Sequence, residues 1–474
     1  MMGLEKYLLM RHELILTLIT LIILIAELSV KDENGRKLRP FSIILLFIAT
    51  VIGFFPMDSG SLFGGMYQTS GIIVMMKNVL NIGVLIVFIQ SYTWLGNDEN
   101  RIKVSEFFLL MLSTLIGMDF MISSGDFLMF YIGLELATIP IASLAAYERK
   151  KAKSAEAGIK LILISALSSG IMLYGISMIY GTTGSIYFSE VAQHFTNNNL
   201  QTLALIFFFA GMAFKISIVP FHLWTADVYE GAPINVTSYL SVISKGAAVF
   251  IFMIVMFTVF RTVIAVWQDI LYITAVITMT VGNLFAMRQK NLKRFLAFSS
   301  ISQAGFIFLG IIGGNKIGMT AVVYFMLIYI FSNLGAFGVI SAISNKTGKE
   351  NMDDYDGLYL TNPKLSLIMM LSLFSLAGIP PVAGFFGKFF LFTAAAQQGF
   401  YILVLIAVLN TIVSLYYYLL IIKAMFINKS ENPIAYFKND GYTKLGLLIC
   451  TIGIIATGFL SMIFEYIGSL SFGI

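Results

Sequence analysis

The sequence has few cysteines, histidines and charged residues. Cys450 is the single cysteine, which excludes a disulfide framework or a cysteine-ligated metal cluster within the chain. The three histidines, His12, His194 and His222, are far apart in the sequence, so we expect no structural or catalytic metal site. Charged residues make up only 12% of the 474 positions, and a net charge of +5 gives no reason to expect a nucleic-acid partner.

Hydrophobic residues make up 58% of the chain, a share that water-soluble globular domains of this length do not reach. Runs of about 20 apolar residues, enough to cross the hydrocarbon core of a bilayer, recur almost from end to end. They lack the alternation of membrane-barrel strands, so we predict an all-α membrane protein. The fourteen predicted spans are 13–30, 41–56, 71–92, 105–123, 126–146, 157–180, 201–219, 234–258, 268–286, 295–313, 318–343, 365–396, 400–426 and 443–467.

Lysine and arginine alternate between the connections on the two sides of these spans. One set of connections is basic, whereas the opposite set carries only Arg261 and Lys316. By the positive-inside rule, the basic set faces the cytoplasm or the matrix of an organelle, and both termini lie on the periplasmic or outer side of a cell inner membrane. The basic residues are Lys31, Arg36, Lys37, Arg39, Arg101, Lys103, Arg149, Lys150, Lys151, Lys153, Arg288, Lys290, Lys293, Arg294, Lys346, Lys349, Lys423, Lys429, Lys438 and Lys444.

One predicted inner connection, Pro220 to Pro233, breaks this pattern because it carries no lysine or arginine. The longest polar stretches, around 344–364 and 427–443, are too short to fold alone. We therefore predict a single polytopic membrane domain over residues 1–474.

A few ionisable residues lie inside the predicted spans. A charge there costs about 2.5–3.5 kcal/mol on insertion scales, so these side chains should face a protein interior or a hydrated cavity. Glu135 and Lys245 fall at similar depths near the bilayer midplane, which suits either a proton relay or a static ion pair. Lys77 and Lys160 could equally be structural, since Lys160 could reach the cytoplasmic rim. The full set is Lys77, Glu135, Lys160, Lys215, Lys245 and Lys388.

Two of these lysines lie beside prolines that should interrupt a helix. Lys215 precedes Pro220, and Lys388 follows a Pro-Pro pair in a window longer than one straight span requires. The two segments are five windows apart, the pattern of two inverted five-helix repeats with a broken helix in each, at about 105–258 and 268–426. Two unrelated kinks that happen to contain lysine are the alternative.

Buried lysines suit proton transfer. Loss of hydration lowers the pKa of an ammonium toward neutrality and a nearby carboxylate raises it again, so a change in the carboxylate's influence switches a lysine between holding and releasing a proton. Lysines at similar depth with water between them could pass protons laterally. Because an ammonium cannot coordinate a metal cation, this set favours protons over Na⁺. His222 could connect the cytoplasm to Lys215, although a capping or packing role fits it as well.

Three motifs in these segments match those of a known family. Residues 211–233 read GMAFKISIVPFHLWTADVYEGAP, residues 378–388 read GIPPVAGFFGK, and residues 133–136 read GLEL. They resemble the seventh, twelfth and fifth spans of the subunit N (NuoN) family, the antiporter-like subunits of NADH-quinone oxidoreductase, or respiratory complex I. The VYEGAP motif at 228–233 distinguishes this family from its sister subunits. Ala226 departs from the family pattern, which usually has proline there.

The resemblance implies a fourteen-helix fold with two inverted repeats, in which Glu135 modulates Lys215, Lys245 is the central proton carrier, and Lys388 is the last lysine before release to the outer side. It also implies a proton-translocating subunit of an enzyme that oxidises NADH and reduces quinone. Flavin, iron–sulfur clusters and the quinone pocket would then belong to other subunits, with no redox centre or cofactor in this chain. Its partners would be the other membrane subunits, the lipid bilayer and protons.

Two other hypotheses remain. A subunit of an Mrp-type cation/proton antiporter would share the fold, although the VYEGAP motif argues against it. A structural membrane subunit that conducts nothing would leave Glu135, Lys215, Lys245 and Lys388 unexplained.

Overall fold

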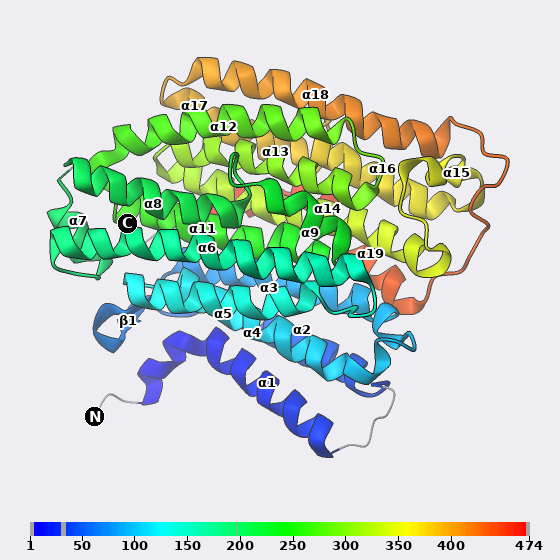
Figure 1. Ribbon diagram of the computed structural model, residues 1–474, viewed down its shortest axis with the longest axis horizontal. Coiled ribbons are helices and arrows are strands. Elements are labelled where there is room, and N and C mark those ends of the chain that lie inside the picture. The colour runs from blue at the N-terminus through cyan, green and yellow to red at the C-terminus, as the bar shows by residue number, and fades with distance from the viewer. Residues whose placement is uncertain (1–3, 30–34, 197, 471–474) are drawn as a thin grey trace.

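The computed structural model describes residues 4–29, 35–196 and 198–470, and most of them are helical. Figure 1 shows the long helices running side by side, with α1 at one end of the bundle and α18 at the opposite end. In the described part of the chain, twelve helical segments are long and apolar enough to span a membrane, and α2 and α16 are shorter apolar helices. The fold is therefore the predicted polytopic helical bundle.

The helices have the following bounds. The first half of the chain forms α1 (Arg11–Ser29), α2 (Leu38–Gly53), α3 (Gly71–Ser91), α4 (Val104–Ile122), α5 (Phe127–Ala145), α6 (Ala152–Thr183), α7 (Phe188–His194), α8 (Asn199–Ile216), α9 (Leu223–Gly231), α10 (Ile234–Tyr239) and α11 (Lys245–Thr258). The second half forms α12 (Ile264–Ala286), α13 (Leu292–Ile312), α14 (Lys316–Thr347), α15 (Leu358–Thr361), α16 (Pro363–Ala377), α17 (Ala383–Gln397), α18 (Tyr401–Phe426), α19 (Gly441–Phe459) and α20 (Ser461–Ser469).

Shorter elements join these helices. A π-helical turn, Leu240–Ser244, lies between α10 and α11. The small hairpin of β1 (Gly60–Leu62) and β2 (Tyr67–Thr69) precedes α3 and is an addition to the predicted all-helical fold. The 3₁₀ turns are Leu4–Met10, Phe63–Gly65, Trp94–Gly96, Arg101–Lys103, Arg261–Val263 and Met352–Tyr355.

All fourteen predicted windows contain helix, with two differences. α6 begins at Ala152, ahead of the predicted start, because the helix extends N-terminally beyond the apolar run. The last window is two helices, since Leu460 is not helical (φ −96°, ψ 88°). The window 365–396 is also two helices, as its prolines predict. Lys31, one of the basic residues used to assign topology, lies outside the described residues.

The centre of the bundle is formed by α13 and α14, whose apolar windows are buried along their whole length, and by α3 and the segment 234–258. α1, α12 and α18 lie at the periphery and bury only a third of their windows. α18 exposes a row of large apolar side chains, including Leu405, Leu409, Ile412 and Tyr416. Such a surface is stable next to lipid tails, so the outer helices separate the central ones from the bilayer.

Small residues let two pairs of helices approach closely. A Cβ added to Gly117 of α4 would lie 2.5 Å from the backbone nitrogen of Ala137 in α5, and one on Gly133 would lie 2.6 Å from that of Met121. In the same way, a Cβ on Gly282 of α12 would lie 2.6 Å from the backbone nitrogen of Ser302 in α13. Close backbone contact through glycine is a common means of packing helices in membranes, where water expulsion adds little.

Two helices are broken where the prolines predict it. α8 ends before Ser217, which has a left-handed backbone (φ 68°), and the N–H of Ile218 donates to the carbonyl of Ala213. α16 ends in the same way before Gly378 (φ 84°), with the N–H of Ile379 donating to the carbonyl of Phe374. Each closure satisfies carbonyl groups that the interrupted helix would otherwise leave unpaired. One break lies in each of the two predicted repeat ranges.

The connection without basic residues, predicted to lie on the inner side, folds as α9 and packs against α6 and α13. Its own carboxylates pair with cations of those helices: Asp227 with Lys160 of α6 (2.8 Å) and with Arg294 of α13 (2.7 Å). Glu230 pairs with Lys153 (2.9 Å). The connection therefore docks on the protein, and the cations of its neighbours replace the basic residues it lacks.

Candidate functional site

The structure places Glu135 of α5 within electrostatic range of Lys215 of α8. The Lys215 ammonium donates a 2.6 Å hydrogen bond to the hydroxyl of Thr138, which lies one turn after Glu135 on α5. Glu135 is near enough to interact electrostatically with Lys215, but no ion pair within 4.0 Å joins the two in the described part of the chain. One Glu135 carboxylate oxygen is buried without a hydrogen-bond partner there. The Thr138 hydroxyl, and not the Glu135 carboxylate, is thus the hydrogen-bond partner of Lys215 in this arrangement.

Lys215 owes its position to the break in its helix. It is the second residue before the left-handed Ser217, and only 9% of its surface is exposed. The helix ends immediately after it, so the surrounding backbone is irregular and can hydrogen-bond to water.

Lys245 begins α11, directly after the π-helical turn, and is 1% exposed. Its ammonium donates to the carbonyl and to the hydroxyl of Ser300 on α13, each at 3.0 Å. The predicted alternative, a static ion pair with Glu135, is wrong, because among the described ion pairs none includes Lys245. Although their depths are similar, the two residues point to different neighbours.

Lys388 lies after the second break and is 4% exposed. Its ammonium donates a 3.1 Å hydrogen bond to the carbonyl of Ala377, the last residue of α16, and lies 4.5 Å from the centre of the Phe306 ring. The carbonyl is one that the break frees, and the ring face provides a weak electrostatic attraction for the cation. The proline break thus creates the acceptor that this lysine uses.

The other candidates divide into different environments. His222 precedes α9, is 8% exposed, and its Nδ1 has no hydrogen-bond partner among the described residues. Lys160 reaches the rim, where it pairs with Glu156 (2.6 Å) and Asp227 (2.8 Å), which favours the structural role. Lys77 is fully buried against Glu13, away from these residues in the sequence and on different helices.

A polar stripe on α10 and on the π-helical turn after it leads to Lys245, and it was not among the predicted features. Asn235, Ser238 and Ser241 recur at helical spacing before Lys245, and α14 adds Ser341, which donates to the Asn235 side chain at 3.2 Å. Spacings of three, three and four residues place such side chains on one helix face, so this signal was readable in the sequence. Thr138 was also missed, because an isolated threonine in an apolar helix carries no comparable pattern.

The stripe begins at a polar cavity of about 490 Å³ on the side of the basic connections. Its lining includes Asn235, Ser341, Lys293 and Glu350, and the last two form an ion pair at 3.2 Å. A cavity of this size holds several water molecules and has polar partners for them. The cavity and the stripe together form a polar route from one face of the bundle toward Lys245.

The sequence is similar to named relatives over nearly its whole length. A family model described as "NADH:quinone oxidoreductase/Mrp antiporter, TM" matches residues 124–414. The NADH-quinone oxidoreductase subunit N of Phocaeicola vulgatus is 51% identical over 465 residues, which cover 98% of each chain. The chloroplastic NAD(P)H-quinone oxidoreductase subunit 2 of Mesostigma viride is 36% identical over 465 residues, covering 94% of this chain and 92% of its own.

Solved structures give the same picture of the fold. A chain of respiratory complex I from Thermus thermophilus superposes with a TM-score of 0.81 at 26% identity, covering 95% of this chain and 97% of that one. A chain of the Mrp complex from Dietzia sp. DQ12-45-1b reaches a TM-score of 0.85 at 20% identity, covering 98% and 97%. Because the fold is common to both assemblies, sequence identity rather than shape separates them. This multi-pass membrane protein therefore belongs to the subunit N family of antiporter-like subunits of NADH-quinone oxidoreductase.

Proposed function

We propose that this chain carries protons across the membrane as the antiporter-like subunit of an NADH:quinone oxidoreductase, driven by quinone reduction elsewhere in the complex. Its family membership supports the choice of complex. The environment of its buried lysines supports the choice of proton transfer over a purely structural role.

The observation that carries this proposal is the kind of partner each lysine has. Lys215, Lys245 and Lys388 donate to a hydroxyl or to carbonyl oxygens, all neutral groups. A structural ammonium in such a place would need a carboxylate, because a buried unpaired charge is strongly unfavourable. Lys245 and Lys388 can therefore release a proton without leaving an uncompensated carboxylate behind, so both protonation states are accessible to them. Release from Lys215 is opposed by the Glu135 carboxylate, which fits the modulating role of that residue.

We infer a route with these residues in sequence. Protons enter from the polar cavity, Glu135 modulates Lys215, Lys245 is the central carrier, and Lys388 passes protons to the outer side. The serine and asparagine stripe on α10 supplies the hydrogen bonds that ordered water would need between the cavity and Lys245. His222, with a free ring nitrogen beside the first break, serves on the inner side of Lys215.

The surroundings of Glu135 support neighbouring membrane subunits as partners. This residue is only half-buried, and Ile132, Leu136 and Ile139 around it on α5 are exposed. An ionisable group facing lipid is unfavourable by about 2.5–3.5 kcal/mol, so we propose that another subunit covers this face. We propose that flavin, iron–sulfur clusters and quinone belong on partner subunits, as the family membership suggests. For the clusters, the sequence adds that one cysteine cannot supply the thiolate ligands.

We propose the cell inner membrane as the location, with both termini on the periplasmic side. The basic connections supply the argument, because positively charged loops are retained in the cytoplasm.

The test is Lys245→Ala in membrane vesicles, with assembly checked on a native gel. General acid–base groups contribute on the order of 10²–10⁴ in rate, so quinone reductase activity and proton uptake should fall together by at least roughly tenfold. Lys290→Ala, in an exposed inner connection, is the matched control and should leave both unchanged. Wild-type rates in an assembled Lys245→Ala complex would show that the lysine is structural. Copurification with other antiporter-like chains in place of redox subunits would favour the Mrp-type assembly.

A further inference from the structure

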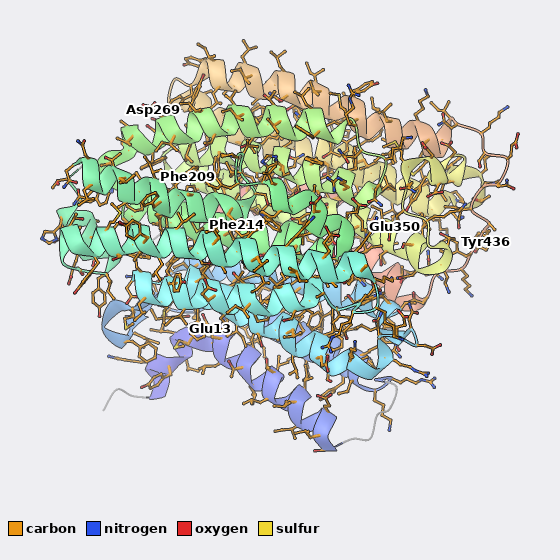
Figure 2. The ribbon with its side chains drawn as sticks, in the orientation of Figure 1. Glu13, Phe209, Phe214, Asp269, Glu350 and Tyr436 are labelled. Atoms are coloured by element: carbon orange, nitrogen blue, oxygen red, sulfur yellow. The ribbon has the colours of Figure 1, made fainter. Side chains whose placement is uncertain are left out.

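A second group of buried ionisable residues lies among the N-terminal helices, outside the route above. The Lys77 ammonium of α3 contacts the Glu13 carboxylate of α1 at 2.5 Å, and the two side chains are 0% and 1% exposed. The Tyr67 hydroxyl on β2 accepts from Lys77 at 3.0 Å and lies 3.1 Å from both Glu13 oxygens. Figure 2 shows Glu13 on the side of α1 that faces the rest of the bundle. Lys77 therefore has a charged partner, unlike the three lysines of the proposed route.

Asp119 of α4 completes this group. It is fully buried and close enough to Lys77 and Glu13 to interact electrostatically with both. Neither of its carboxyl oxygens has a hydrogen-bond partner among the residues the structure describes. An ionised carboxylate in that situation would lose its hydration without replacement, which is among the least favourable arrangements in a protein interior.

The charges of the group do not balance unless it binds a proton. Two carboxylates and one ammonium leave one net negative charge in a buried place, and two carboxylates that share a site do not both ionise easily. One bound proton makes the group neutral. Because Lys77 contacts Glu13 directly, the proton belongs on Asp119 in this arrangement.

We propose that Glu13, Lys77 and Asp119 form a second proton-binding site, which holds one proton on Asp119 while Lys77 is paired with Glu13. The inference does not rest on the proposed transport function, because it concerns the protonation of the resting protein. If Lys77 turns to Asp119, the proton passes from the Asp119 carboxyl group to the Glu13 carboxylate, and the net charge stays at zero.

Two other titratable groups, His12 and Tyr239, lie beside this site. His12 of α1 is hydrogen-bonded to the Asn78 side chain of α3 (3.0 Å). It is close enough to Lys77 and Glu13 to interact electrostatically with both. Tyr239 of α10 interacts electrostatically with Asp119, while its hydroxyl is hydrogen-bonded to the Thr114 hydroxyl. Tyr239 directly precedes the π-helical turn that leads to Lys245, and such turns are frequent at functional sites. Tyr239 therefore lies between Asp119 and the segment that leads to Lys245.

The site can be tested by counting protonated carboxylic acids in the infrared C=O stretch, in the assembly with which the chain purifies. Asp119→Asn should lose one acid, because it removes the protonated group. Glu13→Gln should also lose one, because Asp119 then ionises as the partner of Lys77. Lys77→Met should gain one, since neither carboxyl group can remain charged without the ammonium. Asp98→Asn, an exposed carboxylate, is the control and should change nothing.

Either of two results would overturn the proposal. The first is an Asp119→Asn spectrum equal to wild type, or a Lys77→Met spectrum without the added acid, which would mean that Asp119 is ionised. The second is failure of Asp119→Asn to assemble while Asp98→Asn assembles normally, because a neutral amide should replace a neutral acid of the same shape.

Discussion

At the scale of single residues, the partner of a lysine separates the two kinds of buried ammonium in this protein. Lys77 meets a carboxylate at 2.5 Å, whereas Lys245 and Lys388 meet uncharged oxygens at 3.0 and 3.1 Å. Removing a proton from Lys77 would strand Glu13 as a buried anion, so this lysine should stay charged whenever Glu13 is ionised. Removing a proton from Lys245 leaves no buried carboxylate without its cation, because its partner is Ser300.

The Thr138 hydroxyl should matter because it holds the Lys215 ammonium beside Glu135. A hydrogen bond to a charged group contributes about 1.5–3 kcal/mol, and 1.4 kcal/mol is about tenfold in an equilibrium, so we expect Thr138→Val to reduce proton uptake roughly tenfold. Thr138→Ser keeps the hydroxyl and should stay near wild type. Vesicle proton uptake measures both variants, and equal rates for valine and wild type would remove Thr138 from the mechanism.

Asp440, which lies just before α19 and outside the membrane span, makes a pH-dependent prediction. Burial opposes its ionisation, but hydrogen bonds from the Thr443 and Thr93 hydroxyls and from the backbone outweigh burial and lower the pKa of Asp440 below its usual 3.8. Its stabilisation is therefore present above pH 3.8 and is lost as the pH falls through the lower, folded-state pKa.

The measurement is thermal unfolding in detergent. At neutral pH, Asp440→Ala should lose about 1 kcal/mol, the typical value of a helix N-cap, and the difference from wild type should shrink below about pH 4. Asp440→Asn keeps a capping oxygen and should show little change at neutral pH. A difference between alanine and wild type that is the same at pH 7 and in acid would contradict the prediction.

At the scale of elements, the two broken helices use the same closure with different residues at its turn. Gly378 takes the left-handed conformation in one break, and Ser217 takes it in the other. A side chain makes this conformation less favourable by roughly 1–2 kcal/mol, so Ser217 is held there by its surroundings. Lys215 comes before the first break in the chain, whereas Lys388 comes after the second break. Two inverted repeats would allow this difference. The repeat relationship itself stays a prediction.

These two positions form a matched pair for mutation. Gly378→Ala adds a Cβ 3.0 Å from the Lys388 Cδ at a φ of +84°, so it should destabilise the protein by about 1–2 kcal/mol and lower turnover through Lys388. Ser217→Gly relieves the same strain and should leave stability unchanged or slightly higher. Thermal unfolding and quinone reductase activity report both effects, and a Gly378→Ala protein with wild-type stability would be inconsistent with strain at this turn.

At the scale of the whole molecule, the arrangement follows from burial. The central helices α13 and α14 are surrounded by protein, so their polar residues never meet lipid. Peripheral helices such as α18 carry the apolar surface that the bilayer requires. The buried lysines and the polar stripe of α10 can therefore be hydrated inside the bundle while the outer surface stays apolar.

The proposed orientation can be tested with single cysteines, because Cys450 is buried and can be replaced by serine. Asn432→Cys lies in an exposed basic connection and should react only with membrane-permeant maleimides in intact cells. Ser61→Cys, exposed in the hairpin, should react with impermeant reagents as well. Inverted vesicles should reverse the pattern, and the opposite labelling in cells would reverse the assigned topology.

Much of the fold was predictable because its determinants are local. Span length, apolar composition and proline position act within single segments, and the windows they predict contain the observed helices. The cost of a charge in lipid likewise predicts that Lys215, Lys245 and Lys388 are buried, as they are. The alternative in which Glu135 and Lys245 form an ion pair is wrong, because depth along two helices does not reveal which faces meet.

The sequence by itself determined that this chain is a helical membrane protein with interrupted helices and buried lysines, since hydrophobic length and desolvation are properties of each segment. Only the tertiary structure decided which group each ammonium meets. Lys215 reaches a residue 77 positions away, Lys245 one 55 positions away, and Lys77 one 64 positions away. Such contacts depend on how distant helices pack and rotate against one another, and that rotation is set by the packing of the whole bundle.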